Sequence, residues 1–195
     1  MQISEGSSFH AWVDESMRQK DIPVPMYLLG AVVANPDECD GARQELRNIL
    51  PKGAPKLHWH AMEPREKTRA TAVVSSFGAT HLVVVGTPLD HRKQERARAQ
   101  CMEQLYWRLG EMGVTKVFLE AREKSQQQKD LQLVNVLRIR KVMPERLRVE
   151  IGFPSEEPML WIPDQVLGAL GDAETDDTRW FTQYGGSVER INISL

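Results

Sequence analysis

The pattern of apolar and polar residues along the chain predicts short strands separated by amphipathic helices. Residues 9–13 form a short apolar run, and Met26–Ala34 (MYLLGAVVA) is β-rich and apolar on both faces, as a central strand is. A polar turn that contains prolines lies between the two runs, so we expect them to form an antiparallel hairpin. Further strands are predicted at residues 81–86, 116–120, 147–153 and, at an edge of the sheet, 187–194.

Helical periodicity and capping residues predict five helices between these strands. Asn35 is a candidate N-cap ahead of Pro36, and the helix that follows should end at about residue 50, before Pro51. The other helices are predicted at residues 63–77, 91–111 and 159–170, with one more after a polar stretch at 124–130, in which Leu131, Val134 and Leu137 face inward. This order of elements predicts an α/β fold, an open mixed sheet with helices on both faces. No internal repeat or low-complexity linker interrupts residues 1–195, so we expect a single domain.

Composition and charge are those of an ordinary globular protein. Of the 195 residues, 41% are hydrophobic and 27% are charged, and the formal net charge is −2. A chain with this charge has no overall attraction for nucleic acid, so binding to a phosphate backbone needs a local basic surface. Two groups of basic residues offer such a surface, although solvated helix faces are the simpler explanation for both. The groups are Arg92, Lys93, Arg96 and Arg98, and Arg138, Arg140, Lys141, Arg146 and Arg148.

The sequence shows no sign of secretion or of a membrane anchor. The first residues lack a basic region followed by an apolar stretch, and no segment approaches the roughly 20 apolar residues that cross a bilayer. Cys39 and Cys101 lie far apart and outside any paired motif, so we expect two reduced thiols. The expectation is a cytoplasmic protein without membrane contact, and the sequence specifies no oligomeric state.

Three acidic residues occupy positions where a ligand site is expected. Asp14 directly follows the first apolar run, Glu120 ends the run KVFLE, and Asp164 lies in the first turn of the apolar helix WIPDQVLGAL. Side chains at strand ends open onto the crevice where α/β sheets bind ligands. Each acid also has a simpler explanation: a turn cap for Asp14, solvent exposure after a strand for Glu120, and a favourable helix-dipole contact for Asp164. Carboxylates that gather repel one another, and Mg²⁺ or Mn²⁺ relieves the repulsion, so the three together predict a divalent-metal site.

A second concentration of reactive groups is the segment KLHWH. His58 and His60 are two residues apart and share a side if the segment is extended, which is one arrangement for a bound zinc or manganese ion. One packed and one solvent-facing histidine is the simpler explanation. Beside an acidic metal site, Lys56 or His60 could instead orient a substrate phosphate or carry a proton. The sequence contains no GxxxxGK[ST] loop, no GxGxxG after a strand and no GxSxG elbow.

Four motifs occur in an order that resembles a known family. They are Asp14-Glu15-Ser16 after FHAWV, the strand YLLGAVV, the segment KLHWHAM and the helix WIPDQVLGAL. Together they resemble the domain-of-unknown-function 3800 family, for which a ribonuclease H-like fold is predicted. The resemblance spans roughly residues 9–170.

The resemblance implies roles for individual residues. Asp14 would be the principal metal ligand, Glu120 the acid on a later central strand, and Asp164 the acid on a helix. His60 matches the family histidine, because Ala61 supplies the small residue that follows it. Two departures are Pro163, where the family often has alanine, and Glu120, where aspartate is common in related nucleases. The longer glutamate side chain still reaches a metal but weakens a strict two-metal assignment.

Three functions are therefore open at this point. The first is a nuclease or phosphodiesterase that depends on Mg²⁺ or Mn²⁺ and hydrolyses phosphodiester bonds in nucleic acid, with metal ligands Asp14, Glu120 and Asp164 and with Lys56 or His60 at the scissile group. The second is a non-catalytic binding or scaffold protein of the same fold. A hydrolase of small phosphoesters that binds zinc through His58 and His60 is the third hypothesis.

Overall fold

A six-stranded mixed sheet forms the centre of the computed structural model, which describes residues 8–195. The strand order is β5-β4-β1-β2-β3-β6. β1 pairs with β2, and β2 with β3, in antiparallel fashion, whereas β4 lies parallel to β1 and to β5, and β6 lies parallel to β3. The strands are β1 (Phe9–Arg18), β2 (Met26–Ala34), β3 (Thr80–Thr87), β4 (Val114–Glu120), β5 (Arg148–Gly152) and β6 (Val188–Ser194).

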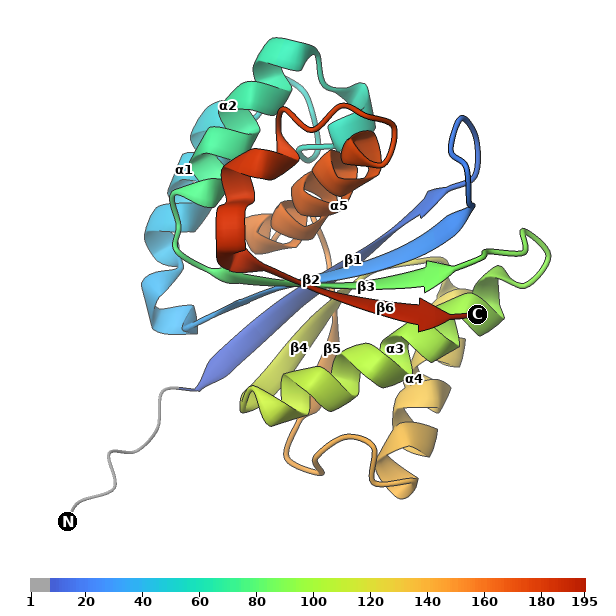
Figure 1. Ribbon diagram of the computed structural model, residues 1–195. Helices are drawn as coiled ribbons and strands as arrows, with labels where there is room; N and C mark the ends of the chain where they lie inside the picture. Colours follow the sequence, from blue (N-terminus) through green and yellow to red (C-terminus); the bar gives the residue numbers. More distant parts are fainter. Residues whose placement is uncertain (1–7) are drawn as a thin grey trace.

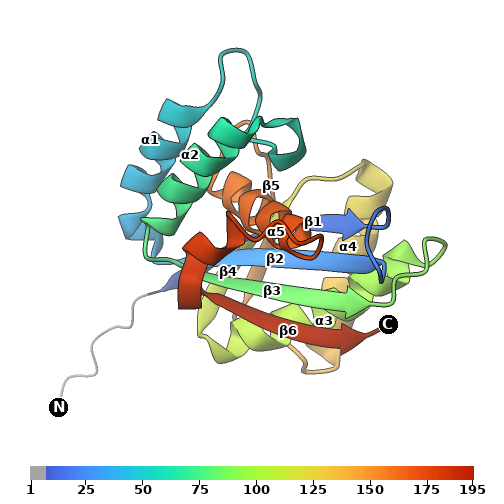
Figure 2. The same cartoon turned by 45° about the horizontal axis from the view of Figure 1, so that its top comes forward.

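Helices cover both faces of this sheet. Figures 1 and 2 show α1, α2 and α5 on one face and α3 and α4 on the other. α5 packs across β1 and β2, and α3 packs on the opposite side of β2 and β3. The helices are α1 (Asp40–Ile49), α2 (Pro64–Ser75), α3 (Gln94–Glu111), α4 (Lys124–Ile139) and α5 (Trp161–Ala173), with short 3-10 helices at Pro36–Glu38, Trp59–Ala61, Pro158–Leu160 and Phe181–Ser187.

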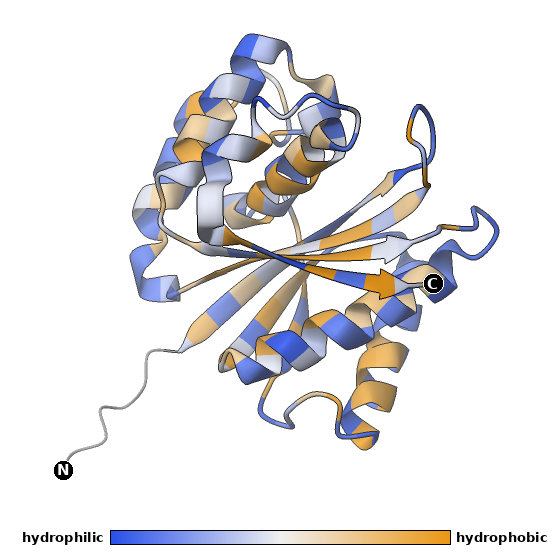
Figure 3. Cartoon of the chain, in the orientation of Figure 1, coloured by the Kyte–Doolittle hydropathy of each residue, from blue (hydrophilic) through white to orange (hydrophobic). Residues whose placement is uncertain are grey.

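Two apolar cores lie on the two sides of the sheet. Alternate residues of β1 enter different cores: Trp12 packs with the α5 side, and Ala11 and Val13 pack with the α3 side. β2 is buried from Met26 to Val33, which explains why its sequence is apolar at every position. In Figure 3 the hydrophobic colour is concentrated on the central strands and on α5.

The sequence predicted this α/β architecture correctly, including the first hairpin and β6 at an edge of the sheet. Asn35 is an N-cap as expected, because its side chain accepts a hydrogen bond from the backbone N–H of Asp37. None of the helices within residues 8–195 combines the length and the apolar character needed to span a membrane.

Two details of the prediction were wrong. β1 does not end before Asp14 but continues to Arg18, because its pairing with β2 extends through Arg18 and Met26. α4 begins at Lys124, so the polar stretch at 124–130 is helical, and Leu131 on this helix is 39% exposed instead of buried. Lysine and glutamine are good helix formers, and α4 is held to the fold by the buried Asp130 as well as by Val134 and Leu137.

Candidate active site

Adjacent strands bring two of the predicted acids together. Val13 on β1 is paired with Leu119 on β4. Asp14 and Glu120 are the next residues of these two strands, so they lie side by side. Trp12 and Phe118, two residues earlier in each strand, stack on the α5 side with ring centroids 5.8 Å apart. Because side chains two residues apart in a strand share a face, Asp14 and Glu120 also project to the α5 side. Both line a cavity of about 180 Å³ at this end of the sheet.

Asp164 approaches the same place from α5. It lies in the first turn of the helix, is only 6% exposed, and accepts a hydrogen bond of 2.7 Å from the backbone N–H of Trp59. α5 can lie close to the sheet here because Gly30, the partner of Asp14 on β2, has no side chain: a Cβ atom would stand 2.9 Å from Leu167. Burial and the negative charges of Glu120 and Asp164 raise the pKa of Asp14 well above its usual value. The three acids predicted from the sequence therefore interact electrostatically.

A lysine ammonium group lies among these acids. Lys56 Nζ is 2.5 Å from Glu120 Oε1. Burial acts to lower the pKa of Lys56, but the charges of Asp14, Glu120 and Asp164 and the hydrogen bond to Glu120 outweigh it, and the pKa is raised. Lys56 is thus a positively charged group at neutral pH, and it offsets part of the negative charge of the acids.

The segment that carries Lys56 is anchored to both ends of α5. The backbone N–H of Trp59 binds Asp164, and its indole Nε1 donates to Asp172 Oδ2 at 2.9 Å. Gly168 lies between the two acids on α5 and leaves room for the indole, since any Cβ atom there would overlap the ring. Lys67 Nζ reinforces this contact, because it binds Asp172 at 3.0 Å and lies 4.7 Å from the centre of the Trp59 ring.

The two histidines of this segment occupy different environments. His58 Nδ1 is 3.4 Å from Asp164 Oδ2, and this interaction raises the pKa of His58. For His60, burial and then the charge of Arg18 lower the pKa. The two rings lie 5.8 Å apart in an edge-to-face arrangement. Of the two, His58 contacts a predicted metal ligand, although the family resemblance points to His60.

The donor set suits a hard divalent cation but does not form a complete cage. Within residues 8–195, no group of three or more His, Cys, Asp and Glu side chains is arranged to hold a metal ion. This also applies to the zinc hypothesis for His58 and His60. Carboxylate oxygens are the preferred ligands of Mg²⁺, which commonly uses only one or two carboxylates and keeps several waters. Glu120 has an oxygen for this purpose, because its buried Oε2 has no hydrogen-bond partner in the described part of the chain.

The sequence did not predict the ion pairs among four charged residues close to the site, and Arg98, which it placed in a possible basic surface, is buried. Glu15 projects to the α3 side, opposite to Asp14, and forms ion pairs with Arg98 and with Arg122 Nε at 3.1 Å. Arg98 binds Asp130 through two hydrogen bonds of 2.8 and 2.9 Å. The alternation of side chains along a strand could have shown that Asp14 and Glu15 face apart, but the arginine partners lie far away in the sequence.

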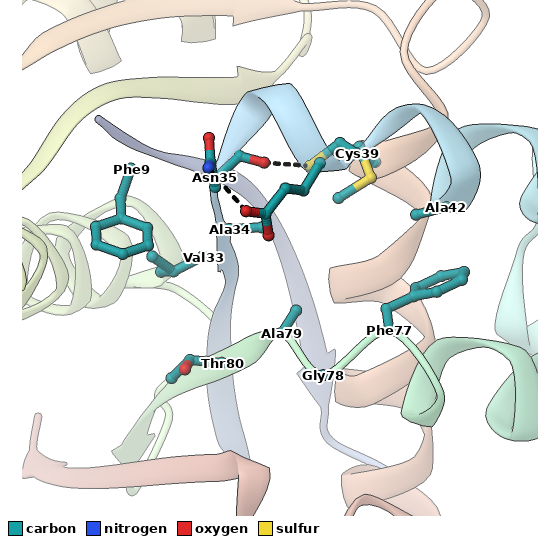
Figure 4. Close-up of a pocket in the computed structure, with 12 residues that line it drawn as sticks. Phe9, Val33, Ala34, Asn35, Cys39, Ala42, Phe77, Gly78, Ala79 and Thr80 are labelled. Atoms are coloured by element: carbon teal, nitrogen blue, oxygen red, sulfur yellow. Dashed lines mark hydrogen bonds between the residues drawn. The ribbon is translucent and has the colours of Figure 1, made fainter. Parts of the chain in front are cut away.

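A larger cavity of about 370 Å³ lies away from all predicted site residues (Figure 4). It is found beside the first residue of β1 and the end of β2, and both apolar and polar groups line it. The figure shows Cys39 and Phe77 on opposite sides of this space. Because Asp14 and Glu120 line the smaller cavity, we place the candidate active site there.

Comparison with known proteins identifies the fold but not a sequence family. No protein-family model matches the chain, and no curated protein matches it either. Among solved structures, ribonuclease H2 from Pyrococcus horikoshii OT3 aligns with a TM-score of 0.56 and 9% identity over 93% of this chain and 81% of that one. Ribonuclease HII from Archaeoglobus fulgidus, solved in complex with PCNA, aligns with a TM-score of 0.52 and 12% identity over 92% and 80%.

These alignments establish a ribonuclease H-like α/β fold for this chain. The particular solved structures that share it are ribonucleases of the H2 or HII type. At 9–12% identity the likeness concerns the fold alone. The absence of a matching family model leaves the resemblance to the domain-of-unknown-function 3800 family unconfirmed.

Proposed function

We propose that this protein is a divalent-metal-dependent nuclease or phosphodiesterase of the ribonuclease H-like type. The main support is the position of Asp14 and Glu120, which directly follow the paired residues Val13 and Leu119 and line one cavity, with the buried Asp164 close enough to raise the pKa of Asp14. Repelling carboxylates lower stability in the absence of a counter-charge, so a site that keeps them together is suited to a cation. The ribonuclease H-like fold of the solved relatives agrees with this proposal.

In this proposal Asp14, Glu120 and Asp164 hold Mg²⁺ or Mn²⁺. Such an ion activates water and neutralises charge at a phosphodiester when it is bound. The protein's own groups position the reactants: the backbone N–H of Glu15 orients Asp14 Oδ1 at 2.7 Å, and that of Trp59 orients Asp164. Lys56 Nζ and the imidazoles of His58 and His60 are the groups that could contact the scissile phosphate or carry a proton.

The substrate class we propose is nucleic acid, and the family we propose is the domain-of-unknown-function 3800 family. The four sequence motifs support the family, and the ribonuclease H-like fold that it implies is present. We also propose that residues 1–195 form a single domain that acts in the cytoplasm.

A non-catalytic binding or scaffold protein is the second candidate. Its support is the ion pair between Lys56 and Glu120, which already compensates one acid, together with the lack of a three-ligand group within residues 8–195. This candidate predicts that Mn²⁺ neither binds at the acidic cavity nor promotes hydrolysis.

The experiment that separates the two candidates is hydrolysis by wild type and by Asp14→Ala. Labelled single-stranded RNA, double-stranded DNA and an RNA–DNA hybrid are incubated with Mn²⁺ or with EDTA. We expect cleavage that requires Mn²⁺ and that falls by at least about 100-fold in Asp14→Ala, a loss typical of removing one group that stabilises developing charge. Asp37→Ala is the matched control, because Asp37 is exposed and lies outside the acidic cavity.

The result has two clear readings. Hydrolysis that persists undiminished in Asp14→Ala while the fold is retained by circular dichroism contradicts the proposed site. Absence of hydrolysis in the wild type on all three substrates, together with absence of Mn²⁺ binding, supports the scaffold candidate.

A further inference from the structure

We propose that the ammonium group of Lys56 is a built-in cation of the acidic centre, so that the centre takes a single divalent ion instead of two. This inference rests on the proposed function, which requires a metal at the same acids. It assigns the number of ions and a role for Lys56 that is distinct from contact with a phosphate. The observations that support it are the contacts of Lys56, the free oxygen of Glu120 and the charge of the centre.

The two carboxylate oxygens of Glu120 have different surroundings. Lys56 Nζ binds Oε1 at 2.5 Å. The second oxygen, Oε2, is buried and has no hydrogen-bond partner within residues 8–195. A buried carboxylate oxygen without a partner is costly, and a metal ion is one group that satisfies it. Glu120 can therefore serve the ammonium group with one oxygen and one divalent ion with the other.

Lys56 is held in this position by its neighbours in the chain. Leu57, the next residue, is 2% exposed, and its carbonyl oxygen accepts a hydrogen bond of 3.4 Å from Gln165 Nε2 on α5. Trp59, two residues further, is anchored to Asp164 and to Asp172. The backbone beside Lys56 is thus attached to the helix that carries Asp164, which keeps the ammonium group beside the acids.

The charges of the centre agree with one ion. Asp14, Glu120 and Asp164 carry three negative charges when ionised, and Lys56 reduces the total to two, which one divalent ion neutralises. A second divalent ion would leave two positive charges in a partly buried site, which is unfavourable. On the other face the residues that line the same cavity are already paired, because Arg98 and Arg122 bind Glu15 and Asp130.

Counting bound Mn²⁺ ions tests the inference without measuring activity. Isothermal titration calorimetry gives the number of ions per chain and their affinity, and the electron paramagnetic resonance signal of free Mn²⁺ gives an independent count. Wild type is compared with Lys56→Met, which removes the charge, and with Lys56→Gln, which removes the charge but keeps a hydrogen-bond donor. Lys52→Met is the matched control, because Lys52 lies on the same connection between α1 and α2 but is exposed.

We expect one Mn²⁺ per chain for wild type and for Lys52→Met, and two for both Lys56 variants. A count of two in the wild type overturns the inference, and so does a count of one in both Lys56 variants, whatever their affinity. In either of these cases the proposed function stands, because the acids still bind metal. A wild type that binds no Mn²⁺ contradicts the proposed function itself, whatever the variants bind. Thermal unfolding of each variant confirms that the counts refer to folded protein.

Discussion

Asp14 and Glu15 are neighbours on β1, but their side chains lie in two different charged regions on opposite faces of the sheet. Glu15 joins a network in which Arg98 and Arg122 balance Glu15 and Asp130, and most of the donors and acceptors are paired. Asp14 joins a cluster in which acids outnumber the one lysine.

The two regions differ in how completely their charges are balanced. Arg98 is 3% exposed, and its guanidinium binds Asp130, Glu15 and the hydroxyl of Tyr27. Burial acts to lower the pKa of Arg98, but its acidic partners Asp130 and Glu15 outweigh this effect. The pKa is raised, so the guanidinium keeps its charge. On the Asp14 side Lys56 relieves only part of the repulsion, and residual repulsion of this kind is typical of a site that binds a ligand.

The largest effect on stability is expected for Arg98→Met, on the balanced side. Removal of one partner leaves Asp130 buried and uncompensated, which should lower the free energy of unfolding by about 3–5 kcal/mol. Urea denaturation followed by circular dichroism measures this. Arg140→Met is the control, since Arg140 pairs with Glu103 at the surface and such pairs contribute about 0–1 kcal/mol. Equal losses in the two variants would contradict the structural role of the network.

A smaller effect, which depends on pH, is expected at His81. This buried residue belongs neither to the Arg98 network nor to the acidic cluster. His81 is 2% exposed, packs against the Tyr184 ring at 5.6 Å, and its Nδ1 has no partner in the described part of the chain. Burial lowers the pKa of His81 from 6.5 to about 4.

The sign of the pH dependence follows from proton binding. Between pH 4 and 6.5 the unfolded chain binds a proton at this position that the folded chain does not, so the free energy of unfolding falls as the pH decreases through this window. The contribution of His81 to this fall is roughly 3 kcal/mol. In His81→Leu this part of the pH dependence should disappear, as measured by urea denaturation at several pH values. His91→Leu is the control, because His91 is exposed and should keep the wild-type slope.

The smallest effect is expected for Asp14→Asn, which should stabilise the protein, whereas Arg98→Met destabilises it. Since burial, Glu120 and Asp164 all oppose ionisation of Asp14, the neutral amide should raise the free energy of unfolding at neutral pH in the presence of EDTA. We expect a gain of roughly 0.5–2 kcal/mol, the usual size of a single stabilising substitution. Mn²⁺ should stabilise the wild type more than this variant. Destabilisation by Asp14→Asn in EDTA would show that the acids are not under mutual repulsion.

Much of the fold follows from local patterns in the sequence. The uninterrupted apolar run of β2 predicts a strand covered on both faces, and it is buried from Met26 to Val33. The same reasoning fails for α4, where the helix is anchored by Asp130 as well as by apolar residues, and a buried acid looks like a solvent-exposed residue in the sequence. Apolar periodicity thus identifies elements that pack by hydrophobic contact, and it misses anchors that depend on ion pairs.

By itself the sequence determined the α/β class, the hairpin of β1 and β2, and the choice of Asp14, Glu120 and Asp164 as residues to consider together. Only the tertiary structure decided that Lys56 binds Glu120, that His58 contacts Asp164, and that Arg98 pairs with Asp130. The physical reason is the separation along the chain: residues 56 and 120, or 58 and 164, meet only through the pairing of strands and the packing of α5. Local patterns show whether a segment is a helix or a strand and which side chains it carries. They do not show which distant residue pairs with a charged side chain.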